Sequence, residues 1–104
     1  MYRATTPTHI FTLPIDTSDC AEIQVSYQQG DFKFIKHYQD GVLPQGMTLD
    51  GNDVNIYLTQ EDTKKFKKGK ASVQIRVLTV LGKAMASQWM EVSVFDVISE
   101  DILA

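Results

Sequence analysis

The sequence contains little of the chemistry from which catalytic and metal centres are built. Among its 104 residues there is one cysteine, Cys20, so no disulfide can form within the chain, which favours a reducing compartment. The two histidines, His9 and His37, lie in different predicted elements from Cys20, whereas a structural zinc site needs four nitrogen or sulfur ligands. We therefore expect no catalytic residue, no metal and no cofactor. Cys20 is expected to be half-buried at the start of a strand, with both histidines at the surface.

Long hydrophobic runs are also missing, and basic residues are not in excess. No apolar stretch approaches the ~20 residues that span a bilayer, and residues 1–7 lack the apolar segment of a secretory signal, so we expect no membrane contact. The net charge of −3 argues against a dedicated nucleic-acid binder. Half of the ten basic residues nevertheless fall within one short stretch, for which we expect a solvated helix end or a contact with an acidic partner; they are Lys64, Lys65, Lys67, Lys68 and Lys70.

What the sequence does contain is an alternation of apolar and polar residues with a period of two. Only an extended strand places the apolar members of such a run on one face. The runs lie at 11–13, 23–27, 32–38, 54–58, 73–77 and 90–94, with a shorter one at 47–49. Glycine-containing turns separate them at 29–31, 50–53 and 81–83, and the third turn is expected to join the two longest strands. Pro7 and Pro14 bracket the first run, which predicts an edge strand.

One short helix is predicted over residues 59–67. Thr59 is a good N-cap, Glu61 and Asp62 place negative charge in the first turn, and lysines follow late, as the helix dipole prefers. Phe66 would anchor this helix against the core. The expectation is therefore an all-β fold, an immunoglobulin-like antiparallel β-sandwich of about seven strands with one short helix, in a single domain over residues 1–104. A small barrel is the alternative. Residues 96–104 read as strand, short helix, or a flexible or partner-binding arm.

Four apolar residues face away from the predicted core. If Met90, Val92 and Val94 point inward, their neighbours on the same strand point outward, and the same holds for the strand around 73–77. Exposed apolar patches often mark interfaces. The candidate interface residues are Leu78, Val80, Trp89 and Phe95. A bulge that reverses the facing, or cover by the loop 39–46, is the other interpretation.

Three segments carry a resemblance to known proteins. The opening Thr5–Pro14, the segment Leu58–Thr63 and the run Val73–Thr79 resemble small proteins encoded among tail and structural genes of phages and prophages of Firmicutes. They are also similar to the N-terminal β-sandwich of baseplate upper proteins. The resemblance covers about Thr5 to Val94 and implies a fold and a genomic setting, and no functional residues transfer from it.

Two hypotheses of function follow. The first is a non-enzymatic structural or assembly protein of a phage or prophage particle, associated with tail or baseplate and acting through protein–protein contacts. It would be a virion component made in the bacterial cytoplasm, with other tail or baseplate proteins or further copies of itself as partners. The alternative is a carbohydrate-binding or other ligand-binding β-sandwich module, in which Trp89 and the four tyrosines stack on sugar rings. An enzyme would need a pocket lined with titratable residues, and no spacing in the sequence indicates one.

Overall fold

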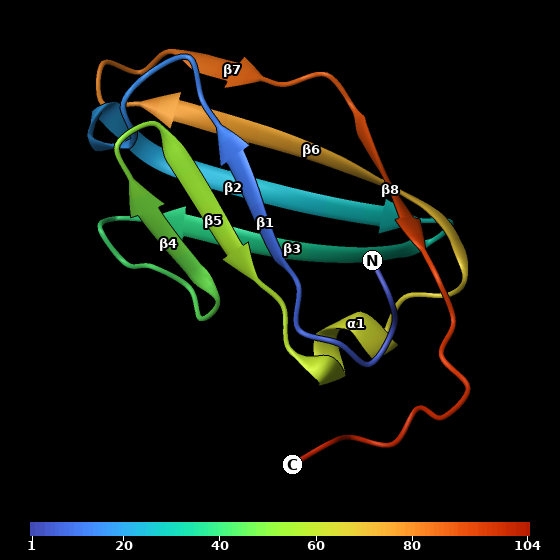
Figure 1. Cartoon of the computed structure of the whole chain (residues 1–104). Coiled ribbons are helices and arrows are strands. Elements are labelled where there is room, and N and C mark those ends of the chain that lie inside the picture. The colour runs from blue at the N-terminus through green and yellow to red at the C-terminus, as the bar shows by residue number, and fades with distance from the viewer.

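Two antiparallel β-sheets pack face to face in the computed structural model, which describes residues 1–104 (Figure 1). The smaller sheet has three strands, in the order β1 (Thr8–Thr12), β5 (Asp53–Tyr57) and β4 (Met47–Asp50). The larger sheet has the order β3 (Phe32–Gln39), β2 (Cys20–Gln29) and β6 (Gly69–Thr79), followed by β7 (Ala84–Ala86) and β8 (Met90–Val94), which both pair with β6. The predicted all-β sandwich is confirmed, with eight strands.

The protein shares the two-sheet architecture of an immunoglobulin domain but differs from it in how the strands are connected. In those domains the second and third strands, B and C, belong to opposite sheets. Here β2 and β3 form a hairpin within the larger sheet, from the pair Gln29 and Phe32 up to the pair Glu22 and Gln39. The smaller sheet is left with three strands, and β1 forms its edge, as Pro7 and Pro14 predicted.

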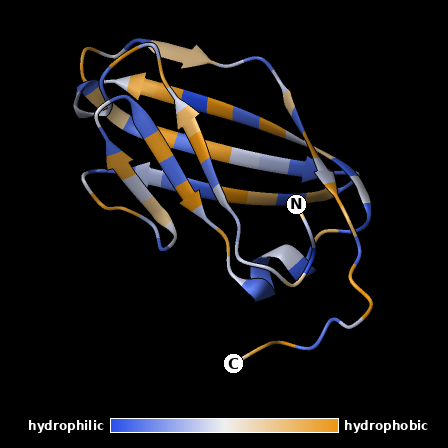
Figure 2. Cartoon of the chain, viewed as in Figure 1, coloured by the Kyte–Doolittle hydropathy of each residue, from blue (hydrophilic) through white to orange (hydrophobic).

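The period-two pattern gives the facing of nearly every strand correctly. Alternate orange and blue bands run along β2, β5 and β6 in Figure 2, because successive side chains point to opposite faces. The residues predicted to face inward on these strands are buried between the sheets. They are Ile23, Val25 and Tyr27 of β2, Val54 and Ile56 of β5, and Val73, Ile75 and Val77 of β6.

The turn at 81–83 does not join the two longest strands, contrary to the prediction. It joins β6 to β7, which has three residues, while the longest strands, β2 and β6, pair directly with each other. The chain leaves the ladder after β7 because Ser87 folds back on β6. The Ile75 amide donates to Ser87 Oγ at 2.9 Å, and the Ser87 amide donates to the Ile75 carbonyl at 2.8 Å. Pairing then resumes as β8, opposite Val73.

The helix is shorter than predicted. α1 spans Gln60–Lys64 rather than 59–67, and Thr59 is its N-cap, as expected. A capping box starts the helix, since Thr59 Oγ1 accepts from the Asp62 amide and the Asp62 carboxylate accepts from the Thr59 amide. The chain leaves the helix at Lys65, and Phe66 then turns into the core. With five residues, α1 is far too short to cross a bilayer, and no other α-helix is present.

Phe66 is fully buried and closes one end of the sandwich. Its ring lies 5.2 Å from that of Phe32, 5.8 Å from that of Tyr27 and 6.0 Å from that of Phe34, measured between centroids. Two of these pairs meet edge to face, an arrangement that adds to the stabilisation from burial. The predicted anchoring role of Phe66 is confirmed.

Two isoleucines of the larger sheet allow a matched test of the facing. Ile75 is 4% exposed and points into the core, whereas Ile35 is 48% exposed on the outer face. We expect Ile75→Asp to abolish folding, because an unpaired buried charge costs about 3–5 kcal/mol or more against a total stability of about 5–15 kcal/mol. Ile35→Asp should leave the urea unfolding curve nearly unchanged. If circular dichroism shows both variants melting like the parent, the facing is wrong.

Candidate interaction surfaces

The four predicted interface residues lie along the whole length of the larger sheet and do not form one patch. Val80 lies just beyond β6 at one end, Trp89 lies between β7 and β8, and Phe95 follows β8 at the other end. All three are exposed, as the facing predicted. Leu78 is half-buried, because it sits between Glu22 of β2 and Ala84 of β7. An interface made of all four residues therefore stays a prediction.

Exposed apolar side chains gather instead at the two ends of an elongated molecule that measures 48 × 28 × 19 Å. The turn end carries the 3-10 turn Thr17–Asp19 and the turns β3–β4, β4–β5 and β6–β7. The helix end carries α1, the β2–β3 turn and both ends of the chain (Figure 1). Exposed at the turn end are Val42, Leu43, Val80 and Leu81, and exposed at the helix end are Tyr2, Phe95, Ile98, Ile102 and Leu103. Sequence reasoning missed most of these because they lie in loops, where alternation predicts no facing.

The turn end is acidic. Its turns carry the aspartates Asp16, Asp19, Asp40, Asp50 and Asp53 and one basic residue, Lys83. Lys36 of β3 donates to the Gln45 carbonyl of the β3–β4 turn at 2.7 Å. None of these side chains forms an ion pair. The Asp16 carboxylate accepts a hydrogen bond from the Ser18 amide at 2.9 Å, and that bond lowers the pKa of Asp16. The turn end therefore presents five aspartates that have no ion-pair partner.

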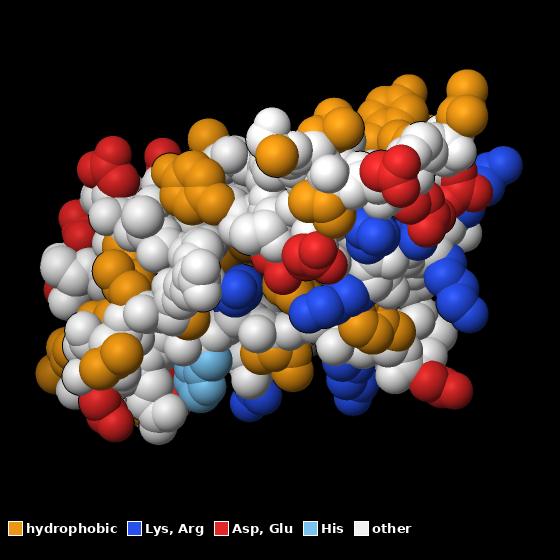
Figure 3. Space-filling view, turned by 90° about the horizontal axis from the view of Figure 1, so that it is seen from below, with side chains coloured by type: hydrophobic (Ala, Val, Ile, Leu, Met, Phe, Trp, Pro, Cys, Tyr) orange, Lys and Arg blue, Asp and Glu red, His pale blue; other side chains and the backbone are white.

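A basic basin lies at the helix end. Lys65, Lys67, Lys68 and Lys70 line an open hollow of about 640 Å³ together with the β2–β3 turn, which contributes one acidic residue, Asp31. Lys70 pairs with Glu91 at 3.4 Å, and the other three lysines form no ion pair. Figure 3 views the molecule from the side of β3 and shows most of the blue basic side chains toward the right, which is the helix end of Figure 1. We call this hollow the lysine basin.

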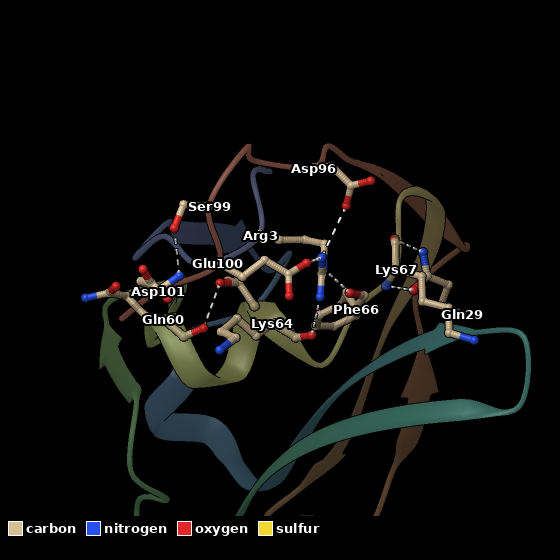
Figure 4. A network of polar contacts seen from close by, with 11 residues as sticks. Arg3, Gln29, Gln60, Lys64, Phe66, Lys67, Asp96, Ser99, Glu100 and Asp101 are labelled. Carbon is tan, nitrogen blue, oxygen red and sulfur yellow. Dashed lines mark hydrogen bonds and ion pairs between the residues drawn. The ribbon is translucent and has the colours of Figure 1, made fainter. Parts of the chain in front are cut away.

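A glutamine holds the lysine basin in place. The Gln29 side-chain amide donates to the Lys67 carbonyl and accepts from the Lys67 amide, both at 2.6 Å (Figure 4). The residues between α1 and β6 do not pair with a strand, and these two hydrogen bonds take the place of such pairing for Lys67. The backbone that carries Lys67 and Lys68 is therefore fixed to the end of β2, while their charged groups stay in solvent.

Arg3 ties three segments together at the helix end (Figure 4). Its guanidinium donates to the carbonyls of Phe66 at 2.6 Å and Lys64 at 3.0 Å, which satisfies acceptors at the end of α1. It also pairs with the carboxylates of Asp96, at 3.2 Å, and Glu100. The arm 96–104 is thus an extended segment without regular secondary structure that runs past α1, rather than a strand or helix.

A second glutamine holds the far end of the arm. The Gln60 side-chain amide donates to the Leu103 carbonyl at 2.7 Å and accepts from the Leu103 amide at 2.8 Å. These contacts are polar and leave the aliphatic side chains of the arm free. Leu103 is 76% exposed and Ile98 is fully exposed.

The titratable groups are placed differently from the prediction. His9 is half-buried rather than at the surface, and its Nδ1 lies 2.7 Å from the hydroxyl of the fully buried Tyr27. Burial lowers the pKa of His9 and raises that of Tyr27, so both are neutral and the tyrosine can donate to the ring. No local pattern indicates this pair, because it forms across the two sheets.

The remaining polar groups lie apart from that pair. Cys20 is buried rather than half-buried, and burial, followed by Asp19 and Asp16, raises the pKa of its thiol. His37 is exposed, as predicted, and pairs with Glu22 at 2.9 Å. No three His, Cys, Asp or Glu side chains lie close enough together to hold a metal ion.

The outer face of the larger sheet is polar and carries one aromatic ring. Trp89 lies over a shallow hollow of about 40 Å³ lined by Ser26, Gln28, Ser72 and Gln74. Further along the same face, a hollow of about 230 Å³ is lined by the Glu22–His37 pair, Gln24 and Arg76, among others. Hydroxyl, amide and guanidinium groups beside an exposed indole are chemically suited to hydrogen-bonding and stacking with a sugar.

An apolar pocket of about 170 Å³ opens between the sheets beside β7. Leu13 and Ile15, which follow β1, form one wall, and Ile75, Val77 and Met85 form the other. The pocket exists because both β1 and β7 are edge strands, so neither sheet covers the gap.

Comparison with known proteins gives no match, whether with family models, curated proteins or solved structures.

The buried pair of His9 and Tyr27 predicts an acid sensitivity of folding. The pKa of His9 is lower in the folded chain than the 6.5 of an unperturbed histidine, so the unfolded state binds more protons as the pH falls below about 6.5. Stability present above that pH is lost on acidification. We expect urea unfolding between pH 7 and pH 5 to show a smaller loss of stability in His9→Gln than in the parent. Equal losses in both proteins would contradict this.

Proposed function

We propose that the chain is a non-enzymatic structural domain that acts through protein–protein contacts, as an assembly component of a phage or prophage particle associated with the tail or baseplate. One observation carries the contact-making role: nine of the thirteen exposed large apolar side chains lie at the two ends of the molecule. Contiguous exposed apolar surface on a soluble domain marks interaction sites. The particle setting is supported by the resemblance of the segments Thr5–Pro14, Leu58–Thr63 and Val73–Thr79.

The core supports this interpretation because it does not use the end residues. The buried cluster is made by the strands together with Leu13, Leu58 and Phe66, whereas Leu81 at the turn end is 94% exposed. A side chain that contributes nothing to the core and exposes its apolar area is free to serve a contact. The long strands β2 and β6 give a rigid block between the two ends, so the ends keep a fixed separation and orientation.

Particle composition tests this proposal. Particles purified by density gradient from the bacterium that encodes the chain should contain it in a fixed ratio to other tail proteins. The variant Leu81→Asp should enter particles at a level reduced about tenfold, because it places a charge in an apolar contact. Ile35→Asp, on the side of the molecule, is the matched control and should enter normally. Recovery of the parent only in the particle-free lysate would contradict the proposal.

A second candidate, a carbohydrate-binding module, is favoured by the position of Trp89 on a polar sheet face. Binding of a soluble cell-wall polysaccharide fragment there should shift the tryptophan fluorescence, since Trp89 is the one tryptophan. Isothermal titration calorimetry compares the variants, because Trp89→Ala has no tryptophan, and we expect this substitution to weaken binding by about tenfold or more, the contribution of one stacked ring. Tyr57→Ala, on the outer face of the other sheet, is the control. Absence of binding across a panel of wall polymers would exclude this candidate.

A further inference from the structure

We infer that the turn end of one copy docks onto the helix end of a second copy, so that the chain self-associates head to tail. The contact brings the aspartate-rich turns of the first copy to the lysine basin of the second. This inference rests on the proposed function and names a partner for it, namely the same chain.

The turn-end aspartates and the lysine basin carry opposite charge, although Asp31 also lines the basin and Lys65 lies over the Phe34 ring. The turn-end aspartates form no ion pair, and neither do Lys65, Lys67 and Lys68 in the lysine basin. Among the acidic residues of the helix end, Asp96 and Glu100 bind Arg3 and Asp62 caps the helix, whereas three form no ion pair: Asp31, Glu61 and Asp101. Complementary patches of this kind steer two proteins together and set their register.

The apolar side chains of the ends supply the burial that charge alone cannot. Val80 and Leu81 are exposed in the β6–β7 turn, Ile98 and Leu103 are exposed in the arm, and the Leu103 backbone is bound by Gln60 of α1. An end face of roughly 28 × 19 Å presents on the order of 500 Å², so an end-to-end contact would bury on the order of 1,000 Å² from two copies. An interface of that area is at the low end for specific contacts, so the contact between two copies is reversible. It becomes stable when an assembly holds many copies together.

The direction of docking follows from the same charges. Two helix ends facing each other would bring lysine basin to lysine basin, and two turn ends would bring aspartates to aspartates. Contacts of basin on basin and of aspartates on aspartates are therefore opposed by like-charge repulsion. A head-to-tail contact joins the turn end of one copy to the helix end of the next, so every open assembly keeps one free turn end and one free helix end. Further copies therefore extend the assembly into a filament or close it into a ring.

The helix end is already ordered before it meets a partner. Gln29 fixes the backbone of Lys67, the capping box fixes the start of α1, and Arg3 fixes its end. Docking therefore orders only the lysine side chains and the apolar tips, which keeps the entropic cost of association low.

Charge reversal at one end at a time tests the inference. One variant carries Lys67→Glu and Lys68→Glu, and a second carries Asp19→Lys and Asp50→Lys; all four side chains are exposed. The control carries Lys33→Glu and Arg76→Glu, which changes the net charge as the first variant does but on the outer face of the larger sheet. Circular dichroism checks that each folds. Sedimentation velocity then measures the average mass from about 10 µM to about 1 mM, a range in which weak, reversible contacts dissociate.

The parent and the control should gain mass with concentration in 0.1 M salt, and should associate at least about tenfold more weakly in 1 M salt, where the Debye length falls from about 10 Å to about 3 Å. Each end variant alone should associate at least about tenfold more weakly than the parent, and an equimolar mixture of the two should recover association, because their reversed ends match.

Several results would overturn the inference. These are a parent that stays monomeric throughout, an association that salt does not weaken, an end variant that associates like the parent, and a mixture that fails to recover. A parent that is monomeric in solution yet present in purified particles overturns head-to-tail docking and leaves the proposed function standing. A chain that self-associates but is absent from purified particles overturns the proposed function and leaves head-to-tail docking standing.

Discussion

The burial of Phe66 is the contact on which the helix end depends. The smaller sheet has three short strands and cannot cover the full length of β2 and β3. The chain after β5 therefore makes one capped turn of helix and places the Phe66 ring against Tyr27, Phe32 and Phe34. Burial of an aromatic ring of this size stabilises the fold by about 3–5 kcal/mol relative to alanine, more than any polar contact near it contributes.

Everything around that ring is positioned by it. Arg3 reaches the carbonyls of Lys64 and Phe66 only because the chain turns inward there, and the same arginine then holds Asp96 and Glu100 of the arm. Gln29 meets the Lys67 backbone one residue further along. A single buried side chain thus sets the place of the lysine basin and of the arm, the two features by which the helix end differs from the turn end.

Alternation in the sequence is enough to predict seven of the eight strands, the core and the first edge strand, but not the three-residue β7. Each strand carries its facing in its own residues, and Thr59 and Phe66 indicate where the helix begins and what it anchors. Contacts across the sheets carry no such local signal. The bond between His9 and Tyr27, and the reach of Arg3 to the end of α1, depend on how β1 and the opening residues lie over the larger sheet. The break that Ser87 makes between β7 and β8 likewise depends on the position of β6.

The ends of the molecule are the hardest part to predict, because turns have no period. Val42, Leu81 and Leu103 are exposed because of where the loops and the arm run, which no local pattern in the sequence predicts. Their proximity to aspartates or lysines depends on how the two sheets pack. Two-dimensional nuclear Overhauser spectra of the parent protein test the central contact most directly. The account predicts cross-peaks between the ring protons of Phe66 and those of Tyr27, Phe32 and Phe34. A Phe66 ring with no cross-peak to any of the three would contradict it.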